Sequence, residues 1–246
     1  MTMQYVQSVK DFFRNPKWGM NMLLGGVSML IPFIGQIILS GWIITQHWAQ
    51  GGEKDPAKFP PFDFNHVEKY LMRGLWPFLA QLVAALVLGT VVGVVAVVLT
   101  FLLIAMIASL GDVAAVLGLL MLLVGFVIYI ALIAGIQALL VPLTLKATLT
   151  QSFNEAFDFD FAFGFLKRVW KELIMSSLFL IVLMIAVLII SVPTLGFGMY
   201  FAMPVVLYSW QSLSKQLYHL HIERGGTEVA LSEKLNDTPP TLPEPA

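Results

Sequence analysis

Four histidines are the residues whose chemistry could most readily be catalytic or metal-binding, and their spacing argues against a metal site. They are His47, His66, His219 and His221. Two histidines that bind one metal from a helix are three or four residues apart, which places both rings on one face. His219 and His221 are two residues apart, so their rings point to different sides. We therefore expect no metal site, and the absence of cysteine excludes thiolate ligands and disulfides.

No nucleophile or cofactor pattern accompanies the histidines. Ser209, Ser212 and Ser214 have no base nearby in the sequence, which also lacks a phosphate-binding glycine loop and a paired-histidine protease motif. The 14 basic and 15 acidic side chains give a net charge of −1, which offers no basic surface for nucleic acid. We expect a protein that is not an enzyme, needs no cofactor and binds no nucleic acid.

Amide side chains are the polar groups inside the apolar segments: Gln36, Gln81, Gln137 and Gln211. A buried amide in a membrane more often bonds a neighbouring helix than lines a pathway for a solute. We favour the first interpretation and keep the second open. No uninterrupted apolar segment has an ionisable residue at its centre, which argues against a transporter coupled to protons or sodium ions.

The elements that must position these residues are apolar segments long enough to cross a membrane. The chain is 58% hydrophobic and 12% charged, with a mean hydropathy of +0.84, so a soluble protein of 246 residues could not cover its surface. A membrane-spanning helix needs about 20 apolar residues. Apolar segments lie at about 18–48, 75–108, 113–145, 172–192 and 197–216.

These segments predict an all-α polytopic integral membrane protein. Its single transmembrane domain is expected over residues 18–222, with two transmembrane helical hairpins after residue 74. Residues 1–17 form an amphipathic N-terminal segment, either a helix at the membrane interface or the helical start of the first span. Residues 223–246 are polar and proline-rich, and we expect a disordered tail.

Segment 18–48 is interrupted near its middle, by Pro32 and Gly35. Proline removes a backbone donor, and irregular backbone at membrane depth must be shielded by protein or water. Segment 18–48 is therefore either one kinked span or a re-entrant helical hairpin. A second break, from Pro193 to Gly196, is predicted to be the turn between the last two apolar segments.

Basic residues determine the expected topology. None of the 14 Lys and Arg lies in the turns at 109–112 and 193–196. Positively charged loops stay in the cytoplasm, so a hairpin at 18–48 places all of them on the cytoplasmic side. A single span there would leave three outside. We favour the hairpin and expect a multi-pass protein of the cell membrane with both termini in the cytoplasm.

Aromatic and basic residues cluster just before three apolar segments, as they do at membrane interfaces. We expect the following side chains at the headgroup level: Arg14, Trp18, Arg73, Trp76, Lys167, Arg168 and Trp170. Segment 157–170 is too charged to span and is interpreted as a turn and short helix in the cytoplasmic interface, although its alternating phenylalanines formally resemble a strand.

Four glycines in the central hairpin could allow two helices to approach closely. Gly89 and Gly93 have GxxxG spacing, and Gly118 and Gly125 share a face of the following helix. Small residues replace the hydrophobic driving force between helices in lipid. We expect packing along Gly93 and Gly125; the alternative is that these glycines face lipid.

A series of proline, glycine and aromatic landmarks resembles a known family. In chain order they are Asn15-Pro16-Lys17-Trp18, Gly25-Gly26, Ile31-Pro32, Phe59-Pro60-Pro61-Phe62-Asp63-Phe64, Arg73-Gly74-Leu75, Ala156-Phe157-Asp158-Phe159, and Tyr208 to Gln216-Leu217-Tyr218. This order resembles the domain-of-unknown-function 4013 family of bacterial and archaeal polytopic membrane proteins over roughly residues 8–220. The resemblance implies a membrane class and a bacterial or archaeal source, and no mechanism.

Two functions remain open at this point. We favour a non-enzymatic scaffold or membrane subunit whose partners are membrane lipids, other membrane proteins or further copies of itself. The alternative is a passive transporter or channel for a small or apolar solute, because broken helices mark binding sites in many transporters.

Overall fold

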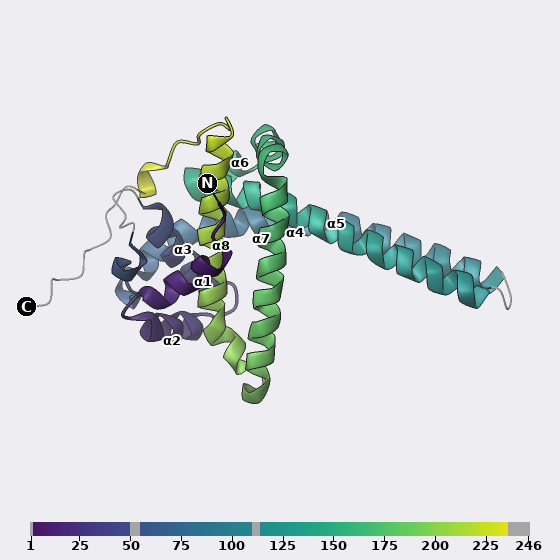
Figure 1. Cartoon of the computed structure of the whole chain (residues 1–246), viewed down its shortest axis with the longest axis horizontal. Helices are drawn as coiled ribbons and strands as arrows, with labels where there is room; N and C mark the ends of the chain where they lie inside the picture. Colours follow the sequence, from purple (N-terminus) through teal and green to yellow (C-terminus); the bar gives the residue numbers. More distant parts are fainter. Residues whose placement is uncertain (1, 50–54, 110–113, 236–246) are drawn as a thin grey trace, which may run out of the picture. The chain divides into compact units, whose positions relative to one another are not determined.

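The computed structural model describes residues 2–49, 55–109 and 114–235, and every regular element in these ranges is a helix. The expected all-α fold is confirmed for them. Figure 1 shows α1 (Tyr5–Arg14), α2 (Trp18–Ser28), α3 (Ile34–Trp48), α4 (Val67–Ser109), α5 (Ala114–Thr150), α6 (Phe153–Ala156), α7 (Phe159–Ser191) and α8 (Phe197–Glu223). Short 3₁₀ helices lie at Pro56–Lys58, Phe64–His66, Val192–Thr194 and Glu233–Leu235.

The chain divides into two compact units, where the sequence predicts one transmembrane domain. Unit 1 comprises Met1–Ala80 and Pro142–Ala246, and unit 2 comprises Gln81–Val141. The long helices α4 and α5 contribute to both. Unit 2 is built only from the second part of α4 and the first part of α5, whereas unit 1 contains all the other helices.

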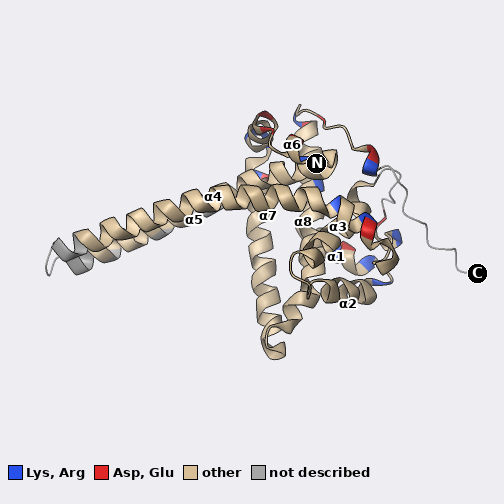
Figure 2. Cartoon of the chain, turned by 180° about the vertical axis from the view of Figure 1, so that it is seen from behind, with Lys and Arg blue, Asp and Glu red and all other residues tan. Residues whose placement is uncertain are grey.

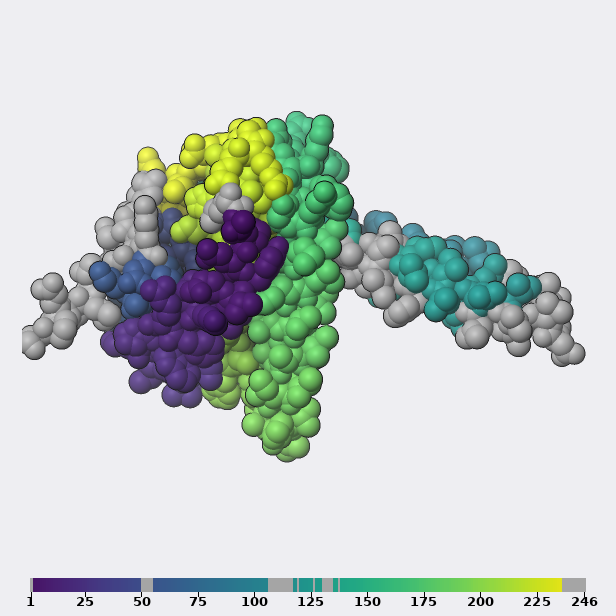
Figure 3. All heavy atoms as spheres, in the orientation of Figure 1, coloured from purple at the N-terminus to yellow at the C-terminus, as the bar shows by residue number. Residues whose placement is uncertain are grey.

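Helix α8 is the centre of unit 1, because α1, α2, α3 and α7 all pack against it. Phe12 of α1, Leu39 and Trp42 of α3, and Tyr208 of α8 are buried in one apolar cluster. The amphipathic α1 thus buries Phe12 in protein. Figure 3 shows the N-terminal helices in purple packed beside α7 in green, with the C-terminal segment in yellow next to both.

Segment 18–48 forms a helical hairpin, one of the two expected arrangements. Residues 29–33 turn between α2 and α3, and Phe33 has a positive φ of 61°. The arms touch at Gly35, where a Cβ would lie 1.9 Å from the carbonyl oxygen of Ser28. At 1.5 Å per residue, the 11 and 15 residues of the arms extend only ~16 and ~22 Å, less than the ~30 Å of a bilayer core.

Helices α3 and α4 cross with their backbones in direct contact. A Cβ at Gly41 would lie 1.8 Å from the carbonyl oxygen of Tyr70, and one at Gly74 would lie 2.0 Å from that of Ile37. No other residue type fits at either position without moving a backbone. This contact positions the first part of α4 against α3 of the α2–α3 hairpin.

Helices α7 and α8 form a second hairpin in unit 1. The break at Pro193 lies in a 3₁₀ turn, followed by Leu195 at φ 52° and Gly196 at φ 88°. Helix α7 is also kinked at Val169, whose φ of −126° is not helical. The segment before the kink is a short helix, as expected. No charged residue lies between Glu172 and Lys215 in the sequence. Most of α7 and α8 is accordingly tan in Figure 2.

Two helical stretches are long and apolar enough to cross a membrane. They are Phe64–Ala105 and Phe159–Thr194, whose most apolar 18-residue windows have mean hydropathies of 2.9 and 3.1. Only 6% and 17% of their most apolar windows are buried, unlike the core helix of a soluble protein. Shorter apolar helical stretches lie at Leu120–Tyr129 and Ala138–Thr150.

The first part of the segment that the sequence predicts to be a disordered tail is ordered within unit 1, where it packs against the end of α5. The amide of Ser232 donates to the carbonyl of Leu149 at 2.8 Å, and Leu235 is fully buried. The hydroxyl of Tyr218 accepts from the amide of Val229 at 2.8 Å. We call residues 227–235 the C-terminal strap. The rest of the predicted tail, residues 236–246, lies outside the described residues.

Candidate functional site

The side chains expected at the membrane interface fall into exposed and buried groups. Arg14 is exposed and forms ion pairs with Asp11 at 3.4 Å and Asp55 at 3.1 Å. Trp18 is exposed and packs edge-on against Phe13, with ring centroids 5.4 Å apart. Trp76 is half-buried. Arg14 and Trp18 therefore lie at the surface of the protein, and Arg14 is paired there with two carboxylates.

Arg73 does not lie at a surface, contrary to the expectation from the sequence. Only 2% of the surface of Arg73 is exposed. The guanidinium donates to Thr45 Oγ1 at 3.0 Å and, from Nε and Nη2, to the carbonyl oxygen of Lys234 at 3.2 and 2.9 Å. The sequence suggested headgroup binding because Arg73 stands next to aromatic residues. The structure uses its charge to join α3, α4 and the C-terminal strap.

Gln151 completes this buried polar cluster at the end of α5. It has a positive φ of 51°, and its Nε2 donates to the carbonyls of Arg73 at 3.3 Å and Thr148 at 2.8 Å. Its Oε1 is buried without a hydrogen-bond partner. The strap covers the same region by bonding Leu149 and Arg73. Sequence analysis missed this cluster, and the only sequence signal for it is the polar pair Thr150-Gln151 directly after an apolar segment.

The beginning of α7 exposes both aromatic and basic side chains. Phe159, Phe163 and Trp170 are exposed, as is Lys167. The ammonium of Lys171 lies 5.6 Å from the Trp170 ring centroid. These aromatic and basic side chains lie on one face of the helix; their expected position at a membrane interface stays a prediction.

The opposite face of the same helix is bound to protein. Arg168 donates to the carbonyls of Gly164 at 3.0 Å and Gly225 at 3.1 Å. Phe161 and Phe165 are buried against the ring of His221. At the helix start, Asp158 caps the amide of Phe161 and bonds Lys146; the hydrogen bond from Lys146 is the main cause that lowers the pKa of Asp158.

Two histidines are buried among aromatic rings. His221 lies 5.5 and 5.1 Å from the rings of Phe161 and Phe165, and neither of its ring nitrogens has a hydrogen-bond partner. His47 lies 4.7 Å from the ring of Tyr208. Among the described residues, no group of three His, Cys, Asp or Glu side chains could hold a metal ion. His47 and His221 pack against aromatic rings in the structure.

The glutamines in the apolar segments show no common arrangement. Gln36 and Gln211 are half-buried in unit 1, and Gln81 is exposed at the start of unit 2. In the part of the chain that the structure describes, their side chains form no hydrogen bond to a neighbouring helix. The side chain of Gln137 lies outside the described residues.

The glycines of the central hairpin border open space instead of a helix contact. A Cβ at Gly89, Gly93 or Gly125 would meet no atom within 4 Å. The expected close approach of α4 and α5 at Gly93 and Gly125 is therefore not present in the structure. Gly118 is buried. Within unit 2, Gly125 lines a cavity of about 520 Å³, and Gly89 and Gly93 line a second one of about 320 Å³.

Comparison with known proteins identifies one family. The family described as "Protein of unknown function (DUF4013)" matches residues 24–197, within the range over which the sequence landmarks resemble it. No curated protein and no solved structure matches the chain.

Proposed function

The chain belongs to the DUF4013 family, so we propose its function from its own geometry: a non-enzymatic integral membrane protein that interacts with lipids and other membrane proteins. In this proposal α4, α5, α7 and α8 cross the bilayer. The α2–α3 hairpin enters it from the cytoplasmic side and returns.

The observation that carries the proposal is the exposed apolar face of α7. Leu173, Ser176 and Val187 of α7 are buried. The other side exposes large side chains, each about half accessible or more: Ile174, Leu178, Ile181, Val182, Ile185, Leu188 and Ile189. Leaving seven such side chains half-exposed to water costs roughly 5–10 kcal/mol, as much as the whole stability of a typical domain. Lipid removes this cost.

The ends of the apolar helices support the same placement. Trp170 and Lys167 are exposed just before the apolar part of α7, and Trp18 is exposed at the start of α2. Tryptophan prefers the headgroup level, and a lysine near an anionic surface contributes about 1 kcal/mol. These side chains would anchor the cytoplasmic side of unit 1.

The non-enzymatic part of the proposal rests on the surroundings of the reactive side chains. His47 and His221 are enclosed by aromatic rings, where a substrate cannot reach them. The buried charge of Arg73 is bonded to the strap and α3. What remains accessible on α7 is apolar or interfacial, which suits lipids and partner helices.

The first experiment asks whether the chain is embedded in a membrane. After expression, the membrane fraction is extracted with alkaline carbonate and then with detergent. We expect the chain to stay in the carbonate pellet and to dissolve only in detergent. Release by carbonate alone would contradict integral insertion. As a matched pair, Ile181→Lys places a charge on the exposed apolar face and should reduce insertion, whereas Lys167→Gln, outside that face, should not.

The second experiment separates a scaffold from a passive transporter. Purified protein is reconstituted into liposomes, and the flux of small polar and apolar solutes is compared with that of empty liposomes. We expect no added flux, together with defined lipids and proteins that co-purify in mass spectrometry. Flux above the empty liposomes would favour the transporter instead.

A further inference from the structure

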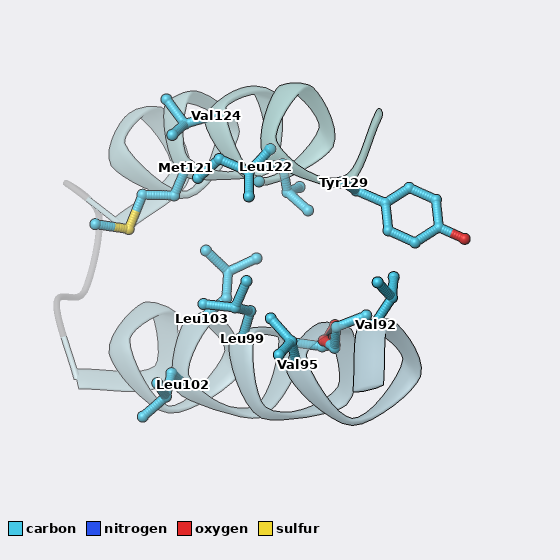
Figure 4. A pocket seen from close by; sticks show the side chains of 13 residues that line it. Val92, Val95, Leu99, Leu102, Leu103, Met121, Leu122, Val124 and Tyr129 are labelled. Atoms are coloured by element: carbon cyan, nitrogen blue, oxygen red, sulfur yellow. Dashed lines mark hydrogen bonds between the residues drawn. The ribbon is translucent and has the colours of Figure 1, made fainter. Parts of the chain in front are cut away.

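The larger cavity of unit 2 lies between α4 and α5 and has an apolar wall. Figure 4 shows Val92, Val95 and Leu99 of α4 facing Met121 and Leu122 of α5 across it. All described lining residues are apolar except Thr100 and Tyr129. A volume of about 520 Å³ is in the range of ligand-binding pockets.

Water is a poor occupant of this cavity. Most of its lining side chains are exposed, among them Leu99 of α4 and Met121 and Leu122 of α5, so the space is an open groove rather than an enclosed void. An ordered water would still need two to four polar partners there. The hydroxyl of Thr100 is already used, because it donates to the carbonyl of Ala96 at 2.8 Å. The hydroxyl of Tyr129 lies at one end of the cavity and points away from it (Figure 4). The described wall therefore offers no set of partners for water, and an apolar occupant is favoured.

We propose that this cavity binds a single acyl chain of a membrane lipid. The inference rests on the proposed membrane location, since the chain must come from the bilayer. The cavity extends along α4 from Val92 to Leu103, about 16 Å at the helical rise. One leaflet of a bilayer core is about 15 Å thick, so the cavity has the length of one leaflet's acyl chain.

The glycines that line these spaces leave room for a larger side chain. Gly125 lines the larger cavity, and a Cβ there would meet no atom within 4 Å. Gly89 and Gly93 line the smaller cavity, and a Cβ at either would also meet no atom within 4 Å. The two cavities share Val92, Ala96 and Tyr129. A large side chain at Gly125 can therefore fill the site without a clash at its first atom.

The test uses full-length protein in lipid nanodiscs that contain a phospholipid with a photoreactive diazirine in one acyl chain. After irradiation, labelled peptides are mapped by mass spectrometry, with chymotrypsin because no Lys or Arg lies between Arg73 and Lys146. We expect labels concentrated in residues 92–103 and 121–129. Gly125→Leu should reduce this labelling by about tenfold, as filling a binding cavity removes the bound state.

Gly135→Leu is the matched control. Gly135 lies on the same helix, a Cβ there also meets no atom within 4 Å, and it lines neither cavity. This variant should label like the unmodified protein. Equal labelling in all three proteins, or labels spread evenly over the apolar helices, would show ordinary contact with surrounding lipid and overturn the proposal.

A second copy of the chain is the competing occupant, and it has its own readout. The protein has no cysteine, so single cysteines at Leu99 and Leu122 can be introduced cleanly. Disulfides between copies at these positions, with no acyl label, would show that a partner helix fills the cavity and would overturn lipid binding. A chain that fails to enter nanodiscs would contradict the membrane location itself, whereas a chain that enters without site-specific label contradicts only the cavity proposal.

Discussion

Glycine residues show how much a spacing rule can and cannot predict. The sequence points to Gly93 and Gly125 as helix contacts, and the structure has open space there. Helices instead meet at Gly41 and Gly74. Both pairs look alike in sequence, because small residues in apolar helices can face a partner, a cavity or lipid. Which of these applies depends on the position of the partner helix. The partner of Gly41 is α4, which is separated from α3 in the sequence by a polar loop.

The contact at Gly41 and Gly74 gives a direct prediction of stability. Gly41→Ala or Gly74→Ala should lower the melting temperature of the protein in detergent, because the added Cβ overlaps a backbone carbonyl. The free energy of unfolding should fall by about 1–3 kcal/mol or more. Gly19→Ala and Gly135→Ala are the controls, since a Cβ meets nothing within 4 Å at either. Similar melting temperatures for all four variants would argue against the crossing.

His221 gives a prediction for the dependence of stability on pH. Burial, followed by the nearby charge of Arg168, lowers the pKa of His221 in the folded protein. As the pH falls below about 6.5, the usual histidine value, the unfolded chain takes up the proton first. Stability is therefore complete above this pH and decreases below it.

The measurement is the melting temperature at pH 7.5 and pH 5.5, for the unmodified protein and for His221→Leu. We expect a smaller drop in the variant. The other histidines stay in both proteins, so their contribution cancels in this difference. An equal drop in the two proteins would mean that His221 does not titrate as described.

At the scale of elements, the sequence is most informative about helices and least about segments without regular pattern. The apolar segments all correspond to helices, and the breaks at Pro32 and Pro193 coincide with turns. The C-terminal strap was missed because composition was averaged over residues 223–246. The prolines of that range all follow residue 238, whereas the strap contains Val229 and Leu235, which are apolar. Its contact with Leu149 could not be read from the sequence.

The short helix before the kink in α7 is predicted to lie in the membrane interface. Spin labels at Phe159, Phe163 and Lys167, all exposed, should report a depth between water and the acyl core, because aromatic rings and basic side chains share this face. The depth of each label is measured in nanodiscs by comparing its quenching by oxygen with its quenching by a water-soluble nickel reagent. Labels that are quenched only by the nickel reagent would place the helix in water.

Lys167→Gln should weaken binding to anionic lipid by about 1 kcal/mol.

At the scale of the whole molecule, charge distribution gives information that helix prediction does not. All basic residues avoid the turn at 193–196 and the stretch between residues 172 and 215. The division into two units is not visible in the sequence, because α4 and α5 are continuous apolar helices across the boundary. A count of apolar segments therefore predicts helices but not how many of them share a core.

The topology remains the main prediction at this scale: both termini lie in the cytoplasm. The α2–α3 and α7–α8 hairpins each bring the chain back toward its starting side, which fits a cytoplasmic position of all basic residues. Reporter fusions at residues 1 and 246, active only on one side of the membrane, should both report the cytoplasm. An N-terminal reporter active on the other face would require segment 18–48 to cross the bilayer once.

The strap has a consequence for the order of events during synthesis. Lys234, whose carbonyl binds the guanidinium of Arg73, follows it by 161 residues. At about 5–20 residues per second, Arg73 is made roughly 8–30 s before this partner exists. During that interval a buried cation lacks two of its hydrogen bonds, so the nascent chain cannot close this region of unit 1. A chain released before residue 234 would lack both hydrogen bonds, so Arg73 would be held in unit 1 without its contact to the strap.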